Sequence, residues 1–328
     1  MVCSLARPAS RVVHPASRYG GAMTSAGGPT VEETQWRGEP ALALRVGDTA
    51  AVFLPGLGMT GVSLRHRGRQ HLATPGGPAA LRGGHTLGLP LLAPWANRLG
   101  GRRYRAAGVA VDLRGRRLHT DGNGLPIHGL LVGATGWRVV ATGTRRGAAR
   151  LTAAIDVDAP AFPFAHRLEL TAAVRPGRLE MTTTVVPTGG RPVPVAFGWH
   201  PYLRLPGTPR SHWRLRLPPR EHLLLDARGL PTGERVAESG GGAPIGRRTF
   251  DDLYAFGRSR VLALESDDAA ISVRADGGYR YAQVWVPPGR PFVALEPMTV
   301  PTNALTDGSV PVVAPGDTFS ATFAVDVR

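Results

Sequence analysis

The clearest strand pattern in the chain is AHRLELTAAV-RPG-RLEMTTTVV, at residues 165–186. Apolar and polar residues alternate along both halves, and a two-residue period is typical of a strand with one buried face. Pro176 and Gly177 between the halves are turn formers, so the stretch predicts an antiparallel hairpin. The side chains expected on its buried faces are Leu168, Leu170, Ala172 and Val174 in the first strand and Leu179, Met181, Thr183 and Val185 in the second.

Outward from this hairpin, short apolar runs separated by turn signals continue in both directions. The chain has 43 glycines and 30 prolines in 328 residues, which favours many short strands over long helices. We therefore predict an all-β chain folded as one large antiparallel β-sandwich. The further strands are expected at residues 50–54, 61–64, 137–141, 150–157, 213–217, 261–264, 271–274, 281–286, 292–296 and 318–327.

The sequence shows no linker that would divide the chain after residue 35. We expect residues 35–328 to form a single domain and residues 1–34 to form a disordered N-terminal arm, with Met23 as an alternative start. The first 30 residues lack the continuous apolar segment of a secretory signal.

Composition limits the partners and the compartment. The single cysteine, Cys3, excludes an intramolecular disulfide framework and a cysteine-rich zinc site. No apolar run reaches the about 18 residues that a membrane helix needs, so we expect no membrane contact and a cytoplasmic location. The net charge is +15 and all 39 basic residues are arginine, but they are scattered along the chain. A nucleic-acid binder concentrates such charge on one element, so we expect no specific nucleic-acid partner.

Two ionisable residues follow apolar runs and precede proline. The run VAFGWHPYL at residues 195–203 carries His200 before Pro201, and FVALEPMT at residues 292–299 carries Glu296 before Pro297. Proline restricts the preceding residue to extended geometry, so both side chains are expected at strand ends. Burial among apolar residues raises the pKa of a carboxyl group. His200 and Glu296 are therefore a candidate acid–base pair, with a core histidine and a structural carboxylate as the simpler alternatives.

Other polar residues have simple structural explanations when taken singly. His128 follows Pro126 and Ile127 and suits a turn, Arg98 is one arginine among many, and Asp251-Asp252 suits a turn. Two histidines and a carboxylate also suit iron or zinc. The sequence contains no His-x-His, so we expect no metal site. The run SGGG at residues 239–242 follows no apolar strand and is expected to be a flexible loop, so we expect no nucleotide cofactor.

Six segments taken in order resemble the aldose 1-epimerase (galactose mutarotase-like) family. The resemblance extends over roughly residues 35–327 and implies the β-supersandwich fold of that family. Each segment alone is a weak signal, but six in the same order are specific. They are PLLAPWANR at 90–98, IHGL at 127–130, GWHPY at 198–202, LPTGE at 230–234, FDDLY at 250–254, and EPMT at 296–299 with NAL at 303–305.

The resemblance implies an isomerase that interconverts the α and β anomers of a reducing hexose without a metal or redox cofactor. In this family pattern His200 matches the general acid and Glu296 the general base. Arg98, His128 and Asp251 match substrate-binding positions, and Asn97 lies beside Arg98.

The family pattern also bears on three further positions or groups of residues. Asp251 is preferred to Asp252 because the family places its aspartate three residues before an aromatic residue, here Tyr254. Leu203 follows Tyr202, at a position where the family often has an aromatic residue, and this change bears on the sugar pocket. The aromatic residues considered for stacking on a sugar face are Trp95, Trp199 and Tyr202.

Mutarotation needs one group to remove a proton from the anomeric hydroxyl and another to protonate the ring oxygen, which suits a base and an acid on separate strands. We expect a small-molecule sugar substrate and a monomer or weak homodimer. Two alternatives stay open: a non-catalytic carbohydrate-binding β-sandwich, and a mutarotase specific for a sugar phosphate held by a pocket arginine.

Overall fold

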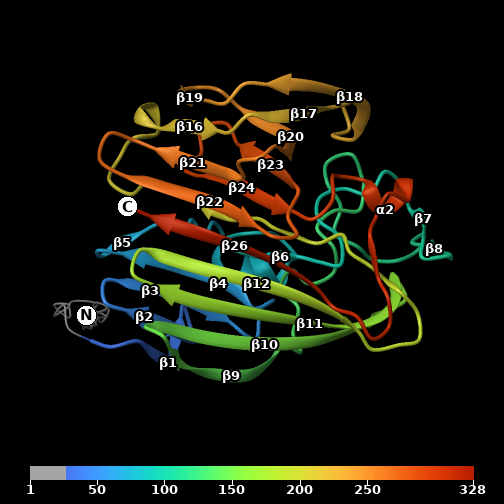
Figure 1. Cartoon of the computed structure of the whole chain (residues 1–328), viewed down its shortest axis with the longest axis horizontal. Helices are drawn as coiled ribbons and strands as arrows, with labels where there is room; N and C mark the ends of the chain where they lie inside the picture. The colour runs from blue at the N-terminus through green and yellow to red at the C-terminus, as the bar shows by residue number, and fades with distance from the viewer. Residues whose placement is uncertain (1–26) are drawn as a thin grey trace, which may run out of the picture.

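The computed structural model describes residues 27–328 (Figure 1). The expectation of a disordered arm therefore lies largely outside the described residues. The domain boundary expected after residue 34 is wrong, because strand β1 (Thr30–Trp36) pairs along its whole length with β2 (Glu39–Val46). The first sheet thus begins at Thr30.

The predicted hairpin is confirmed and lies within the largest sheet. Strands β11 (Phe162–Arg175) and β12 (Arg178–Pro187) pair antiparallel from His166 opposite Pro187 to Arg175 opposite Arg178. All eight side chains predicted to point inward are buried. The two-residue alternation therefore gives the correct register and the correct buried faces.

This sheet has nine strands, which run in Figure 1 from β19 and β16 at the top to β9 at the bottom. Neighbouring strands within it are antiparallel. Their order is β19 (Gly241–Pro244), β16 (Arg214–Leu217), β21 (Val261–Glu265), β22 (Ala270–Asp276), β26 (Phe319–Val327), β12, β11, β10 (Ala148–Ala159) and β9 (Arg138–Arg145).

Two further sheets pack against the nine-stranded one. The five-stranded sheet consists of β1, β2, β3 (Thr49–Leu54), β4 (Thr60–His66) and β5 (Arg69–Gln70). The eight-stranded sheet has the order β18 (Pro231–Glu238), β17 (Arg220–Leu225), β20 (Phe250–Phe256), β23 (Tyr281–Val286), β24 (Val293–Met298), β14 (Gly198–Trp199) and β6 (Leu91–Leu92), with β15 (Tyr202–Leu203) also paired to β24.

The remaining elements are short. They are the pairs β7 (Arg103–Ala106) with β8 (Val109–Asp112) and β13 (Val193–Pro194) with β25 (Val312–Val313), the helices α1 (Gly77–Arg82) and α2 (Ala304–Asp307), and the 3₁₀ helix at Arg210–His212.

The core lies between the layers. Strands β10 and β11 contact β2 and β3, and β22 contacts β24, so the nine-stranded sheet covers both smaller sheets. Among its largest fully buried side chains are Phe53, Phe162, Phe164 and Phe323. Alternating apolar residues on facing sheets thus form the sandwich predicted from the sequence.

Two local expectations are wrong. Residues 239–242 were expected to form a flexible loop, but Gly241–Pro244 is edge strand β19, paired with β16. Asp251-Asp252 lies inside strand β20 rather than in a turn, because both residues pair with β23, Asp251 opposite Trp285 and Asp252 opposite Val284.

Candidate active site

The site forms where the pairing of one strand is interrupted. Strand β24 pairs with β15 at Val293 and Ala294, and with β14 at Met298. Between these points His200 and Pro201 leave the ladder, and residues 295–297 of β24 have no partner on that side within the described chain. Proline lacks an N–H donor, so a strand tolerates Pro297 at such an interruption.

His200 lies directly after β14, as predicted. Its backbone N–H donates to the carbonyl of Pro90, and its side chain is buried. The imidazole stacks on the ring of Tyr202, with centroids 4.7 Å apart, and meets the edge of Trp285 at 5.6 Å. Beneath it, Nε1 of Trp199 donates to Oγ1 of Thr183 on the central hairpin. The hairpin thus anchors the strand that presents the histidine.

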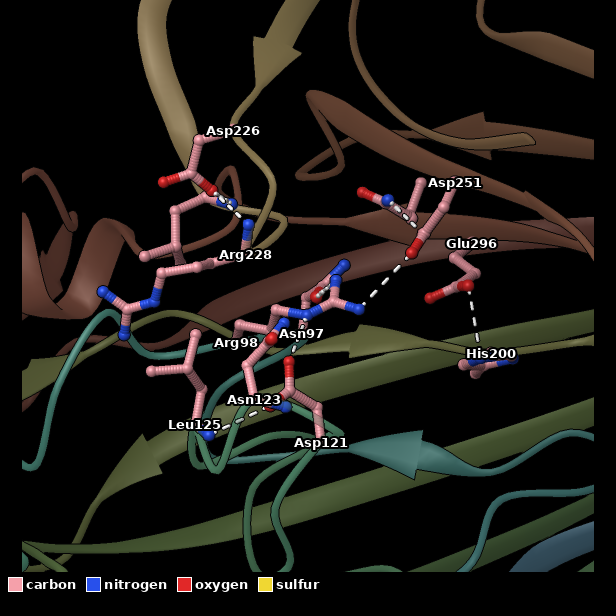
Figure 2. A network of polar contacts seen from close by, with 12 residues as sticks. Asn97, Arg98, Asp121, Asn123, Leu125, His200, Asp226, Arg228, Asp251 and Glu296 are labelled. Atoms are coloured by element: carbon pink, nitrogen blue, oxygen red, sulfur yellow. Dashed lines mark hydrogen bonds and ion pairs between the residues drawn. The ribbon is translucent and has the colours of Figure 1, made fainter.

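Glu296 lies within β24 and not at its end, so that part of the prediction is wrong. Its side chain is buried, and Oε1 lies 3.2 Å from Nε2 of His200 (Figure 2). Its other oxygen, Oε2, has no hydrogen-bond partner among the described residues. The two candidate acid–base groups are therefore in direct contact, and the second carboxyl oxygen is buried without a partner in the described chain.

Burial controls the protonation of this pair. It lowers the pKa of His200 to about 3. It raises the pKa of Glu296 well above its ordinary value, the negative charge of Asp251 adds to that effect, and Arg98 opposes it. Burial thus favours the uncharged form of each side chain, a neutral imidazole and a protonated carboxyl group.

Two loops with unusual backbone conformations bring Asn97 and His128 to the site. Both residues have positive φ angles, 55° for Asn97 and 65° for His128, which cost energy for residues other than glycine. The N–H of His128 donates to the carbonyl of Asn97 at 3.0 Å, so each loop supports the other. Gly129 must be glycine, because a Cβ atom there would lie 2.2 Å from the carbonyl oxygen of Ala93.

This arrangement places His128 against the catalytic candidate. Its ring meets that of His200 edge to face, with centroids 5.4 Å apart. Burial lowers the pKa of His128 well below its ordinary value, so the ring is neutral at pH 7. Its Nδ1 has no partner within residues 27–328. Nδ1 of His128 is therefore a hydrogen-bonding atom beside the acid–base pair that the described chain does not use.

Arg98 is held on three sides. Its Nε donates to Oδ2 of Asp121 at 2.8 Å, Nη1 to Oδ1 of Asn97 at 3.1 Å, and Nη2 to Oδ2 of Asp251 at 3.3 Å. Asp121 was not predicted from the sequence. Its Oδ1 also accepts hydrogen bonds from the backbone N–H groups of Asn123 and Leu125, and these bonds hold the carboxylate in the position where it contacts the guanidinium.

The structure brings Asp251, and not Asp252, to this network. Asp251 accepts a 2.7 Å hydrogen bond from Nε2 of Gln283, a buried residue on β23 that the sequence analysis also missed. Gln283 lies opposite Glu296 in the register of β23 and β24. The side chain of Asp252 instead accepts a hydrogen bond from the hydroxyl of Tyr254. Strand alternation could have found Gln283, since polar residues in buried strands are uncommon.

The aromatic residues differ from expectation. Trp95 and Trp199 are buried in the core, and Trp199 packs against Phe323, so neither is placed to stack on a sugar. Tyr202 is buried beneath His200 and donates to or accepts from the hydroxyl of Thr86. Trp285, which was not predicted, is partly exposed beside His200 and Tyr202.

Within residues 27–328 no three histidine, cysteine, aspartate or glutamate side chains are arranged to hold a metal ion. None of the helices described there combines the length and the hydropathy needed to cross a membrane.

The comparisons agree with the fold and give the family. Residues 46–326 match the aldose 1-epimerase family, so the chain belongs to that family. No curated protein matches this chain significantly.

Solved structures with the same fold have low sequence identity. A galactose mutarotase-like protein from Clostridium acetobutylicum superposes with a TM-score of 0.82 and 18% identity, over 92% of this chain and 99% of its own. A putative aldose 1-epimerase from Escherichia coli K12 gives 0.71 and 18%, over 92% and 99%. A galactose 1-epimerase from Lactobacillus acidophilus gives 0.72 and 13%, over 92% and 98%.

Proposed function

We propose that this protein is an aldose 1-epimerase that interconverts the α and β anomers of a neutral reducing hexose. The observation that carries the proposal is the 3.2 Å contact between Nε2 of His200 and Oε1 of Glu296 in a buried site. Membership of the family supports the reaction class. The groups around the pair match the needs of a polyhydroxylated ligand.

The proposed reaction begins with a proton shift within the pair. Moving the proton from Glu296 to His200 gives a carboxylate and an imidazolium, with no net change in charge. The carboxylate then takes the proton of the O1 hydroxyl while the C1–O5 bond breaks, and the imidazolium gives its proton to O5. O1 and O5 are bonded to the same carbon, so two groups in contact with each other can serve both oxygens.

The open-chain aldehyde can turn about its C1–C2 bond and present either face to O5. Ring closure reverses the transfers: His200 recovers the proton from O5, and Glu296 returns a proton to O1. The proton count is restored after each turnover, so the chemistry needs no external acid, base or oxidant. Oε2 of Glu296 has no partner in the described chain, so it is a second oxygen that can accept the proton of O1 while β24 stays in place.

Substrate binding would use the groups around the pair. Arg98 supplies N–H donors, Asp251 supplies acceptors, and Nδ1 of His128 is unpaired in the described chain. Trp285 is the partly exposed aromatic ring next to His200, and we assign to it the contact with an apolar sugar face.

Charge favours a neutral sugar over a sugar phosphate. The guanidinium of Arg98 already contacts the carboxylates of both Asp121 and Asp251. A phosphate placed there would meet two negative charges and would have to displace one of them. The phosphate-specific alternative is therefore the weaker one.

The test is anomer equilibration of freshly dissolved α-glucose, α-galactose and α-glucose 6-phosphate, followed by polarimetry and proton NMR. We expect wild-type protein to accelerate equilibration of at least one neutral hexose above the buffer rate. Acceleration of α-glucose 6-phosphate alone would contradict the argument from charge and favour a mutarotase specific for a sugar phosphate. Sugar binding without acceleration of any of the three would favour a carbohydrate-binding protein.

A further inference from the structure

A polar cavity lies beside Arg98 and leads away from the acid–base pair. Its volume is about 520 Å³, within the range of about 300–1,000 Å³ typical of small-molecule sites. Arg98 and Asp251 form one part of its wall, and Asn123, His222, Asp226 and Arg228 contribute to the rest. Figure 2 shows Asp226 and Arg228 on one side of Arg98, and Glu296 and His200 on the other.

The turn that forms the outer wall is fixed in place. Oδ1 of Asp226 accepts the N–H groups of Arg228 and Leu230 at 2.8 and 2.9 Å. Gly229 lies directly against Arg98, since a Cβ atom at this position would be 2.9 Å from Cζ of that arginine. The turn between β17 and β18 therefore packs on the guanidinium that the proposed function assigns to the sugar.

The cavity wall offers hydrogen-bonding groups that the described chain does not use. The N–H groups of Asn123 and Arg228 donate to Asp121 and Asp226, but their side chains are exposed and make no hydrogen bond within residues 27–328. The amide of Asn123 and the guanidinium of Arg228 thus face solvent at the rim of the cavity, and neither His200 nor Glu296 lines this cavity.

The charges of the wall define the chemistry of a ligand. The cavity wall carries the guanidinium groups of Arg98 and Arg228. It also carries three carboxylates, those of Asp226, Asp251 and Asp252. A phosphate or carboxylate would gain no net attraction in such surroundings. A neutral ring with several hydroxyl groups can both donate to these carboxylates and accept from Asn123 and Arg228.

We propose that this cavity is a subsite for a second sugar unit, so that the preferred substrate is a reducing disaccharide or longer oligosaccharide. The inference rests on the proposed function, which places C1 of the reducing unit at His200 and Glu296. Arg98 and Asp251 then contact hydroxyls of that unit on the side away from C1. A neutral sugar attached on this side extends past Arg98 into the cavity.

The test compares mutarotation of glucose with that of maltose, cellobiose and isomaltose, which differ in linkage but share a reducing glucose. Wild-type protein is expected to show a higher kcat/KM for at least one disaccharide than for glucose. Arg228→Ala and Asn123→Ala should each raise KM for that disaccharide about tenfold, the effect of losing one good hydrogen bond, and change glucose kinetics less than about twofold. Arg145→Ala, an exposed arginine on β9, is the matched control and should change neither.

Binding gives a second readout that does not depend on turnover. In a Glu296→Gln background, calorimetric titration should show tighter binding of the same disaccharide than of glucose, and Arg228→Ala should remove the difference. Acceleration of glucose with weaker kinetics and binding for all three disaccharides would overturn the subsite and leave the proposed function intact. Absence of acceleration for every sugar would instead contradict the proposed function.

Discussion

Nε2 of His200 lies 3.2 Å from Oε1 of Glu296, and the two side chains are only 6% and 2% exposed. They come from strand segments that are almost 100 residues apart in sequence and meet where the pairing of β24 is interrupted. Isolated charges at this depth would be costly, but a pair that shares one proton is neutral as a whole. The same pair is the proposed source of both proton transfers.

The buried carboxyl group should make stability depend on pH. Burial raises the pKa of Glu296 above its ordinary 4.5, so the folded protein binds a proton that the unfolded chain releases as the pH rises above that value. The free energy of unfolding of the wild type should therefore fall relative to that of Glu296→Gln through this window, by at most about 1.4 kcal/mol per pH unit. Urea unfolding of both proteins at a series of pH values measures the difference.

Below the ordinary pKa the carboxyl group is protonated in both states, so the two proteins should be equally stable there within about 1 kcal/mol. Wild-type protein that is more stable than Glu296→Gln at pH 7 would show that the carboxylate is ionised and stabilised in the fold.

The activity should not be lost on the acid side of neutrality. The reactive form of the pair holds one proton, and His200 takes up a second only near its lowered pKa of about 3. Lowering the pH from 7 to 5 should therefore not reduce kcat/KM, and kcat/KM should fall when the pH rises above the raised pKa of Glu296, as the shared proton is lost. A loss of kcat/KM as the pH falls through about 6.5, the ordinary pKa of histidine, would indicate a solvated histidine instead.

Arg98→Lys should weaken sugar binding although the charge is kept. Lysine cannot reproduce the fork that contacts Asp121, Asn97 and Asp251 at once. We expect KM to rise about tenfold or more with a smaller change in kcat, measured by polarimetry on the best hexose. Arg145→Lys on the exposed strand β9 is the control, and equal effects of both changes would argue against a site role for Arg98.

Asp121→Asn tests whether this residue acts through Arg98. The amide oxygen can still accept from the loop N–H groups, but the charge that holds Nε of Arg98 is lost. KM should rise about three- to tenfold. In the double variant with Arg98→Lys the two effects should be less than additive, because both changes disturb one interaction. Fully additive effects would show that Asp121 acts independently of Arg98.

Sequence alone was sufficient where a local rule decides the outcome. Alternation specified the inward side chains of the 165–186 hairpin, and the strand expected at residues 281–286 has the same bounds in the structure. The position of His200 at the end of a strand was also predictable, because Pro201 restricts the backbone of the residue before it. Such rules use neighbours in sequence and need no tertiary information.

The same rules fail where tertiary contacts decide. Pro297 was expected to end its strand, but it is tolerated because β24 changes partner there. Asp121 was missed because its importance lies in a contact with Arg98, from which it is distant in sequence. The place of Gln283 in a buried strand could have marked it as unusual, but its partner Asp251 is known only from the fold. Trp199 was considered for sugar stacking, but packing against Phe323 assigns it to the core.

The most direct test of the proposed acid–base pair is mutarotation by His200→Asn and Glu296→Gln beside the wild type, on the hexose that wild-type protein accelerates most. Both variants should be confirmed as folded by circular dichroism and thermal unfolding. Loss of about 10²–10⁴-fold in kcat for each variant, with sugar still bound, is the result that the proposed mechanism predicts. Retention of wild-type kcat by either variant would contradict the assignment of His200 and Glu296 as the catalytic pair.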